Sequence, residues 1–426
     1  MMRNTIIRCG GAWLAACFFH AAQAADTAQW ISLEEALGLA AASNERLAIA
    51  RESAEQARLA VKASEAAYWP TLTGAAGYTR ADSDTRTDGP SDQTTMGLTA
   101  QYALYSGFAD SARVRQAEAA LEQARADWAS AGAAVLSDVR KAFVRLLYAQ
   151  ERAGLAETTA ERRRQNLDLV QLRFESGSEN RGSLLRTEAT TRQAEAELEQ
   201  ARRSISVQQR ELAGVLGRED RVAWVARGEW TQPEAVPEPA WNDLMRATPE
   251  RRSAQARVEA QQAQVIIARG NIHPELGLRA GLDRSGEDWP PDNDAWSVGA
   301  TLSIPLFTGG RNISQLAAAR AGLRQAEASL RQTGQNVLLD LESAWAALRD
   351  AIQQRDVQAA FREAAEVRAD IARAQYENGL LSFQNWDQIE DELIQSRQNL
   401  LARERDAALA AAEWDRVRGR SLVDVP

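Results

Sequence analysis

Four carboxylates near the C-terminal end of the chain have the types and spacing that could do chemistry. In a helix, Asp387 shares a face with Glu390 and Asp391, at i+3 and i+4, and Glu392 follows directly. Paired carboxylates act as general acid and base in hydrolases. However, the neighbouring sequence offers no recognisable set of substrate-positioning residues. A charged helix face in contact with water explains the four side chains better than a hydrolase does.

Histidine and cysteine chemistry is excluded by where these residues lie. Cys9, Cys17 and His20 fall within an N-terminal segment that has the charged start and apolar stretch of an export signal. Once that segment is removed, His273 is the one histidine and no cysteine is left. Thiolate metal sites, disulfide frameworks and histidine-dependent triads therefore lack their residues, and we expect neither a metal site nor a catalytic site of these classes.

Two processing sites fit the leader. The Ala-Gln-Ala sequence at residues 22–24 has the small-x-small pattern of a signal-peptide cleavage site, which would start the mature chain at Ala25. The sequence Leu14-Ala15-Ala16-Cys17 also fits the pattern at which a bacterial lipoprotein is cleaved and acylated on cysteine. We expect cleavage before Ala25, with Cys17 as the candidate lipidation site of the alternative.

The charge balance argues against a nucleic-acid-binding protein. The net charge is −9, whereas such proteins usually concentrate positive charge along one face to meet phosphates. The basic run Arg162-Arg163-Arg164 is interpreted as a helix face in contact with water, balanced by Glu157 and Glu161. After the leader, no uninterrupted apolar run reaches the roughly 18 residues that a membrane-crossing helix needs. If the chain crosses a bilayer, strands must do so.

The chain repeats itself about 200 residues apart, which indicates a tandem duplication of one structural unit. Three landmarks keep the same offset without a gap: Leu104-Tyr105-Ser106-Gly107 with Leu306-Phe307-Thr308-Gly309, Asp138, Ala142 and Phe143 with Asp340, Ala344 and Trp345, and Phe174-Glu175-Ser176-Gly177 with Tyr376-Glu377-Asn378-Gly379. We therefore divide the chain into a signal peptide, a first repeat, a connector with one short strand, a second repeat and a tail, at residues 1–24, 25–217, 218–249, 250–419 and 420–426.

Each repeat is predicted to contain a very long helix. Prolines are absent from residues 91–232 and 306–425, so helices can continue there for long distances. A helix over residues 108–175 would be about 100 Å long. Three-four spacing predicts coiled-coil packing, and alanine at alternate positions favours a wall of close helices over a two-helix rod. These positions are Val114, Ala117, Leu121, Ala124, Trp128, Ala131 and Val135, and Leu316, Ala319, Leu323, Ala326, Leu330, Thr333 and Val337.

Shorter helices flank each long one. After Gly177 and Gly379, further helices are predicted at about 183–216 and 383–417, so each repeat contains a helical hairpin. Another helix precedes each strand pair. The first begins at the capping box of Ser32-Leu33-Glu34-Glu35, and its counterpart spans about 250–269.

The strand pairs decide the fold class. Residues 71–105 and 275–306 each contain two segments of about ten residues with alternating apolar and polar side chains, the pattern of outer-membrane barrels. A soluble sheet packed on one face shows the same alternation, but the export signal and the aromatic ends favour a membrane. Four strands cannot close a barrel, so this interpretation requires oligomerisation. The aromatic residues are Tyr68, Trp69, Tyr105, Trp289, Trp296 and Phe307.

With strand pairs placed between long hairpins in two copies, the chain resembles an outer-membrane efflux protein of the TolC-like family. The resemblance is carried by the order and twofold occurrence of short motifs: Ile31-Ser32-Leu33-Glu34-Glu35-Ala36-Leu37, Tyr68-Trp69-Pro70 with Ile272-His273-Pro274, Pro305-Leu306-Phe307-Thr308-Gly309-Gly310, and Tyr376-Glu377-Asn378-Gly379. It implies an α+β membrane protein and a homotrimer built from two tandem repeats per chain. Four strands per chain would close a 12-stranded transmembrane β-barrel, continued by a long periplasmic α-helical coiled-coil cylinder.

The resemblance also implies a function. Such a protein is a passive exit duct in the outer membrane of a Gram-negative bacterium and extends into the periplasm; it is not an enzyme and needs no cofactor. Its partners would be outer-membrane lipid, a periplasmic adaptor (membrane fusion) protein and the inner-membrane transporter of a tripartite efflux or type I secretion system. The alternative is a periplasmic coiled-coil scaffold or adaptor without a membrane barrel.

Roles at the hairpin tips follow from the same resemblance. Gly177 and Gly379 are expected to form tight turns and, with Ser183 and Leu380, to be candidates for adaptor docking.

In the family, acidic residues commonly ring the closed aperture six and nine residues beyond the second tip glycine. Here Asn385 and Gln388 occupy those positions, and acidic residues crowd the following turns. We therefore take Asn385, Asp387, Gln388 and Asp391 as candidate aperture residues.

Overall fold

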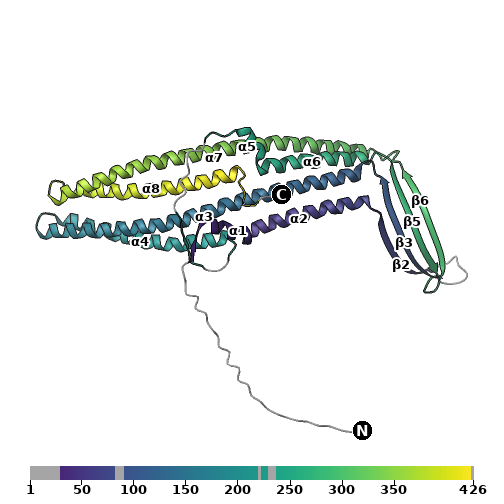
Figure 1. Cartoon of the computed structure of the whole chain (residues 1–426), viewed down its shortest axis with the longest axis horizontal. Coiled ribbons are helices and arrows are strands. Elements are labelled where there is room, and N and C mark those ends of the chain that lie inside the picture. Colours follow the sequence, from purple (N-terminus) through teal and green to yellow (C-terminus); the bar gives the residue numbers. More distant parts are fainter. Residues whose placement is uncertain (1–28, 82–90, 219–221, 229–236, 424–426) are drawn as a thin grey trace, which may run out of the picture.

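The computed structural model describes residues 29–81, 91–218, 222–228 and 237–423. The leader, Cys17 and the start of the predicted mature chain lie outside the described residues. The chain is elongated, with a sheet at one end and two helical hairpins at the other (Figure 1). In chain order the elements are β1 (Gln29–Ile31), α1 (Leu33–Ser43), α2 (Glu45–Glu65), a 3₁₀ helix (Ala66–Tyr68), β2 (Thr71–Ala81), β3 (Ser91–Tyr105), α3 (Ala109–Glu175), α4 (Arg181–Val215), β4 (Trp224–Ala226), α5 (Trp241–Ala247), α6 (Pro249–Gly270), β5 (Glu275–Gly286), β6 (Asn293–Ser303), α7 (Arg311–Glu377) and α8 (Phe383–Val417).

Strands β2, β3, β5 and β6 form one antiparallel sheet in that spatial order. The register places Leu72 opposite Ala100, and Leu98 opposite Leu282. Since side chains alternate between the faces of a strand, the apolar residues of all four strands gather on one face, and several are largely exposed, as with Leu72 at 72% and Trp296 at 77%. An apolar surface this extensive needs lipid or another chain to cover it.

The helices form a wall. Helices α3 and α7 have 67 residues each, which corresponds to about 100 Å. Near the sheet, α3 packs against α2 and α6, and α6 packs against α7; near the hairpin ends, α3 packs against α4 and α8, and α8 against α7 (Figure 1). Helix α3 therefore has neighbours on both sides in each half, so the arrangement is a wall and not a two-helix rod. Among the described residues, no helix combines the length and the apolar character needed to cross a lipid bilayer.

The predicted heptad positions of the long helices are only partly correct. In α3, Val114 and Val135 are buried, but the five predicted positions between them are half-buried. A parallel stripe of alanines lies two residues before alternate predicted positions and is buried throughout: Ala112, Ala119, Ala126 and Ala133. The reason is that α3 packs on two sides, so its closest approach to a neighbour uses the smallest residues and not one central seam.

The middle of the molecule contains the short strand predicted in the connector, which is β4 (Trp224–Ala226), and other features that the sequence did not predict. The first helix is divided at Asn44, whose side chain accepts hydrogen bonds from the backbone of α2 and donates one to Val215 O at 2.7 Å. Helix α5 lies within the predicted connector and packs Trp241 edge-on against Trp345, with ring centroids 5.5 Å apart. Strands β1 and β4 pair in parallel. Helix α5 and strand β4 thus join the connector to both repeats, to α7 of the second repeat and to β1 of the first.

The joint between sheet and helices is crowded in one repeat and open in the other. Gly107 and its counterpart Gly309 both have positive φ, at 64° and 63°. A Cβ atom at Gly107 would lie 2.8 Å from Gly270 O, whereas at Gly309 it would meet nothing within 4 Å. The repeats therefore share a backbone turn but differ in packing around it.

Candidate functional site at the hairpin tips

Both hairpins turn in the same way. Gly177 and Gly379 lie in the left-handed region, with φ of 75° and 73°. Just beyond them, Ser178 N donates to Arg173 O and Leu380 N donates to Gln375 O, each at 2.8 Å. This pattern is a glycine-based helix end in which the last carbonyls of the long helix find donors. The two glycines thus allow each chain reversal within a few residues.

The predicted docking residues are not equivalent. Leu380 is 80% exposed at the tip of the second hairpin. Ser183 is buried in the first turn of α4, where its hydroxyl donates to Glu179 at 3.0 Å and its backbone N–H donates to the N-cap residue Asn180 at 3.0 Å. Ser183 therefore belongs to the helix cap and, although largely buried, lines the groove between the tips.

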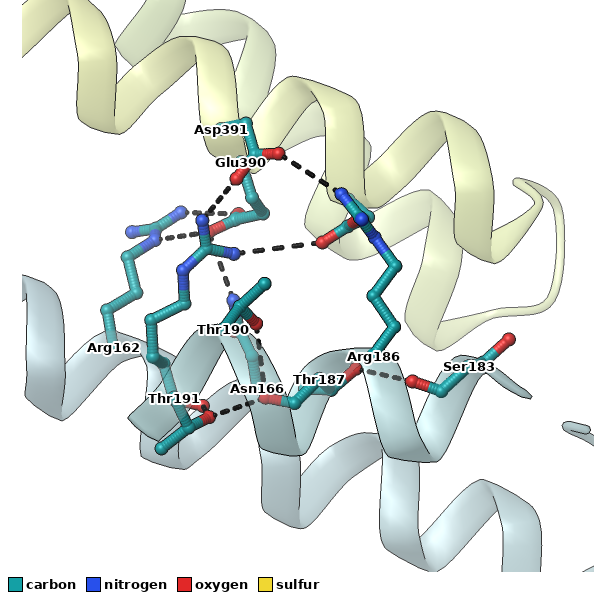
Figure 2. A network of polar contacts seen from close by, with 11 residues as sticks. Arg162, Asn166, Ser183, Arg186, Thr187, Thr190, Thr191, Glu390 and Asp391 are labelled. Atoms are coloured by element: carbon teal, nitrogen blue, oxygen red, sulfur yellow. Dashed lines mark hydrogen bonds and ion pairs between the residues drawn. The ribbon is translucent and has the colours of Figure 1, made fainter. Parts of the chain in front are cut away.

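Asp387 bridges the two hairpins. It lies on α8 and is 6% exposed; its carboxylate accepts a hydrogen bond from Arg186 Nε of α4 at 2.5 Å and lies 3.7 Å from a guanidinium nitrogen of Arg163 on α3. Asp391, one turn later, forms ion pairs with the same two arginines (Figure 2). Both candidate aperture carboxylates are therefore neutralised by the first hairpin.

Glu390 is the most buried member of this network, at 1% exposure. Arg162 of α3 holds it in a bidentate pair, with distances of 2.6 and 2.8 Å, and the Asn166 amide donates to it at 3.2 Å (Figure 2). Burial alone would raise the pKa of Glu390, but hydrogen bonds from Arg162 and Asn166 and the charge of Arg163 lower the net pKa below the usual value of 4.5. Glu390 is therefore ionised at neutral pH.

The interpretation of the basic run as a water-facing helix surface was wrong for two of its three residues. Arg164 does pair with Glu161 and Glu195 on the exposed side. Arg162 instead points across to α8 (Figure 2), and Arg163 forms an ion pair with Asp391 of the same helix. Sequence reasoning had no signal for this contact, because the partners lie more than 200 positions away along the chain. From the sequence, only the carboxylate side of the network could be recognised, by the spacing of Asp387, Glu390 and Asp391 on one helix face.

An aromatic cluster lies beside the ionic network. The rings of Tyr376 and Trp386 are stacked, with centroids 4.3 Å apart and planes 4° from parallel. The Tyr376 hydroxyl donates to Glu179 at 3.0 Å, and the guanidinium of Arg173 lies 4.6 Å from the centre of the Tyr376 ring. Burial, and then the hydrogen bond to Glu179, raise the pKa of Tyr376 above its usual value of 10.0. Tyr376 thus connects the second hairpin to both ends of the first hairpin's turn.

Asn385 and Gln388, the other two candidate aperture residues, are exposed. Gln388 lines an open groove of about 850 Å³ between the tips, together with Asn180, Arg186 and Ser382. The structure brings Asp387 and Asp391 together with the arginines but leaves Asn385 and Gln388 on the surface. In the part of the chain that the structure describes, no group of three His, Cys, Asp or Glu residues could hold a metal ion. A latch of ion pairs between two hairpins is what these groups can form.

Known proteins resemble the chain in sequence and in fold. The family described as outer membrane efflux protein matches residues 36–218 and again 242–420. Fusaric acid resistance protein FusA of Burkholderia cepacia is 29% identical over 49% of this chain, and the match spans 41% of FusA. The probable outer membrane lipoprotein SilC of Salmonella typhimurium is 24% identical over 86% of this chain and 80% of its own. The crystal structure of the outer membrane protein VceC of Vibrio cholerae has a TM-score of 0.80 at 23% identity, over 92% of this chain and 97% of VceC.

Proposed function

Because the chain belongs to the outer membrane efflux protein family, we propose that it is the outer-membrane exit duct of a tripartite efflux or type I secretion system. In this role it conducts passively the substrate that an inner-membrane transporter and a periplasmic adaptor deliver. The observation that carries the proposal is the continuity of two parts: a sheet with one exposed apolar face, and a helical wall about 100 Å long that continues directly from it.

The proposed homotrimer follows from the two unpaired edge strands of the sheet. The sheet ends in β2 on one side and β6 on the other, and unpaired edge strands cost several kcal/mol per polar group in lipid. The direction of the strands alternates across the sheet, so β6 of one copy can pair antiparallel with β2 of the next. The wall has matching edges, α7 on one side and α2 with α4 on the other. Three copies give twelve strands and a closed barrel.

The apolar face, together with the aromatic residues at its ends, approaches the height of a membrane band. On β2 it extends from Leu72 to Tyr78, and on β5 from Leu276 to Leu282. Six steps of about 3.4 Å, tilted by about 40°, give a height of roughly 16 Å, and the aromatic residues at both ends extend it toward the 25 Å band of outer-membrane barrels. Beyond the outer end, Arg284 pairs with Asp294 on the same face. Charged pairs there suit the level of the lipid headgroups.

The tips form the proposed gate and docking region. We infer that Asp387 and Asp391 hold the second hairpin against the first in the closed duct, and that Asn385 and Gln388 face the aperture. Opening then requires separation of α7 and α8 from α3 and α4, with loss of the ion pairs. Exposed Leu380 and the groove beside Gln388 are proposed as the adaptor's docking surface.

The test is cell fractionation followed by reconstitution. The protein should be found in the outer-membrane fraction as a heat-modifiable oligomer, and purified material should form conducting pores in planar bilayers. Release with the periplasmic contents, as a species that leaves bilayers impermeable, would refute the duct and support the periplasmic scaffold. Mass spectrometry of the mature N-terminus tests the proposed cleavage, since a start at Ala25 and an acylated Cys17 have different masses.

A further inference from the structure

The polar face of the sheet carries charge on one strand only. In the described strands β2, β3 and β6, the side chains on this face are those of Ser, Thr, Asn, Gln, Gly and Ala. Strand β5 alone adds charged residues: Glu275, Arg279 and Asp283, at every fourth position. Four residues of strand correspond to about 13 Å, so the three charges are well separated along the strand. Arg279 is the one cation on this face within the described strands.

Arg279 is free to extend. Its neighbours in register are Gln101 on β3 and Gly299 on β6, and Gly299 offers no side chain to pack against it. The side chain is exposed and forms no salt bridge with a residue that the structure describes. An unpaired, exposed guanidinium presents five N–H donors.

Asp283 is placed differently. Its carboxylate lies flat over Gly97 of β3, where any Cβ atom would collide with it, and over Gly281 on its own strand, where a Cβ would lie 3.3 Å from Oδ2. The glycines make room for the carboxylate against the surface of the sheet. Of these two residues, therefore, Arg279 projects from the wall and Asp283 lies along it.

We propose that in the closed barrel three copies of Arg279 form a cationic ring that binds anionic groups of the passing cargo, such as carboxylates, phosphates or sulfonates. This inference rests on the proposed trimeric duct, with the polar face toward the lumen. Twelve strands about 4.8 Å apart and tilted by about 40° enclose a lumen of about 12 Å backbone radius. An extended arginine covers roughly half of that radius. An anion on the axis is then within reach of all three guanidinium groups.

In the trimer, Glu275 and Asp283 would form acidic rings on either side of the Arg279 ring, and these weaken its attraction for anions without cancelling it. For an anion on the axis at the level of Arg279, the acidic rings lie about 10 Å away along the axis, slightly more than the Debye length of about 8 Å at 0.15 M salt. The arginine heads lie only about 6 Å from the same anion. Coulomb's law with water screening then gives an anion concentration at the ring of about two to three times the bulk value, and more at low salt. A multivalent anion gains correspondingly more.

Planar bilayers with a KCl gradient test the ring. Wild-type pores and Arg279→Gln pores are compared by reversal potential. The variant's ratio of potassium to chloride permeability should rise by at least about fourfold, because the two- to threefold enrichment of anions is lost and the equal depletion of cations is relieved. Arg279→Lys keeps the charge and should behave as wild type. Arg284→Gln, on the same strand but the opposite face, is the matched control and should change nothing. Tripolyphosphate is the multivalent probe: it should block wild-type pores, and the block should weaken severalfold in Arg279→Gln.

Chemical modification of a cysteine variant tests the ring even if Arg279→Gln fails to assemble. Arg279→Cys pores are treated with a cationic or an anionic methanethiosulfonate, with treated wild type as the control. The cationic reagent should restore the wild-type reversal potential, and the anionic one should shift it further toward potassium. A reversal potential that changes with neither the substitution nor the reagents would overturn the proposed Arg279 ring. Failure of wild-type protein to form any pore would instead overturn the proposed duct.

Discussion

Removal of the charge of Glu390 should release the latch between the hairpins. Glu390 is 1% exposed, and the side chain of its partner Arg162 is 19% exposed. In Glu390→Gln, the buried guanidinium loses its counter-charge and one of its two charge-assisted hydrogen bonds. Loss of one partner from a buried pair typically costs 3–5 kcal/mol. Because an amide oxygen still accepts one hydrogen bond, we expect about 3 kcal/mol, which shifts a closed-to-open equilibrium by roughly 150-fold.

The assay is single-channel recording of purified protein in planar bilayers. Glu390→Gln pores should show more frequent openings or a larger mean conductance than wild type. The matched control is Glu392→Gln, because Glu392 pairs with Arg368 within the second hairpin, at 2.6 Å, with both side chains more than half exposed. Exposed pairs contribute about 0–1 kcal/mol, so this variant should gate as wild type.

A double substitution separates the loss of the pair from the unpaired charge. Arg162→Leu with Glu390→Leu removes both charges, and buried pairs replaced by apolar residues are often neutral in stability. This double variant should therefore leak less than Glu390→Gln alone. Folded Glu390→Gln trimers with wild-type conductance, or a double variant that leaks more than the single one, would refute the latch.

Further predictions concern the joint, the middle of the wall and the tip. Gly107→Ala should lower the free energy of unfolding by about 3 kcal/mol, because the backbone has a positive φ and the new Cβ would lie 2.8 Å from a backbone oxygen of α6. Gly309→Ala has the positive φ without the collision and should lower it by only about 1 kcal/mol. Equal melting temperatures for the two variants would contradict this. The pKa of Glu413 is lowered from 4.5 to about 2 by hydrogen bonds from Arg416 and, after the opposing effect of burial, from Lys141, so its stabilisation is present above pH 4.5 and is lost as the pH falls toward 2. In Glu413→Gln, the melting temperature should accordingly depend less on pH across that range than in wild type. A pH profile of the melting temperature parallel to that of wild type would argue against this role of Glu413. Replacement of Asp387 and Asp391 together by alanine should change single-channel conductance or cation block, and an unchanged record would reject both as gate residues.

The acid dependence of the tip has the same sign as that of Glu413. The pKa of Glu390 lies below its usual 4.5, so the bidentate pair is complete at neutral pH and is lost only as the pH falls below that value. Mild acidity alone therefore leaves the latch closed. If the tips form the proposed gate, its opening at neutral pH would need a partner that binds the separated hairpins more tightly than the closed ones.

Periodicity explains why much of the fold could be predicted. The absence of proline from two long segments and the alternation in four short ones are local properties, and local sequence determines whether a helix or a strand can form. The duplication then related Gly177 to Gly379 without any structural information. By contrast, the buried stripe of α3 was predicted two residues away from its real place, because which face is buried depends on what packs against it.

At the tip, the sequence by itself determined which charges were present and that Asp387, Glu390 and Asp391 share a helix face. Only the tertiary structure decided that Arg162, Arg163 and Arg186 of the other hairpin meet them. The physical reason is range: the helical period acts over a few residues, whereas an ion pair forms wherever folding brings two charges within about 4 Å. Chain position alone could not distinguish a carboxylate in water from one held between two helices.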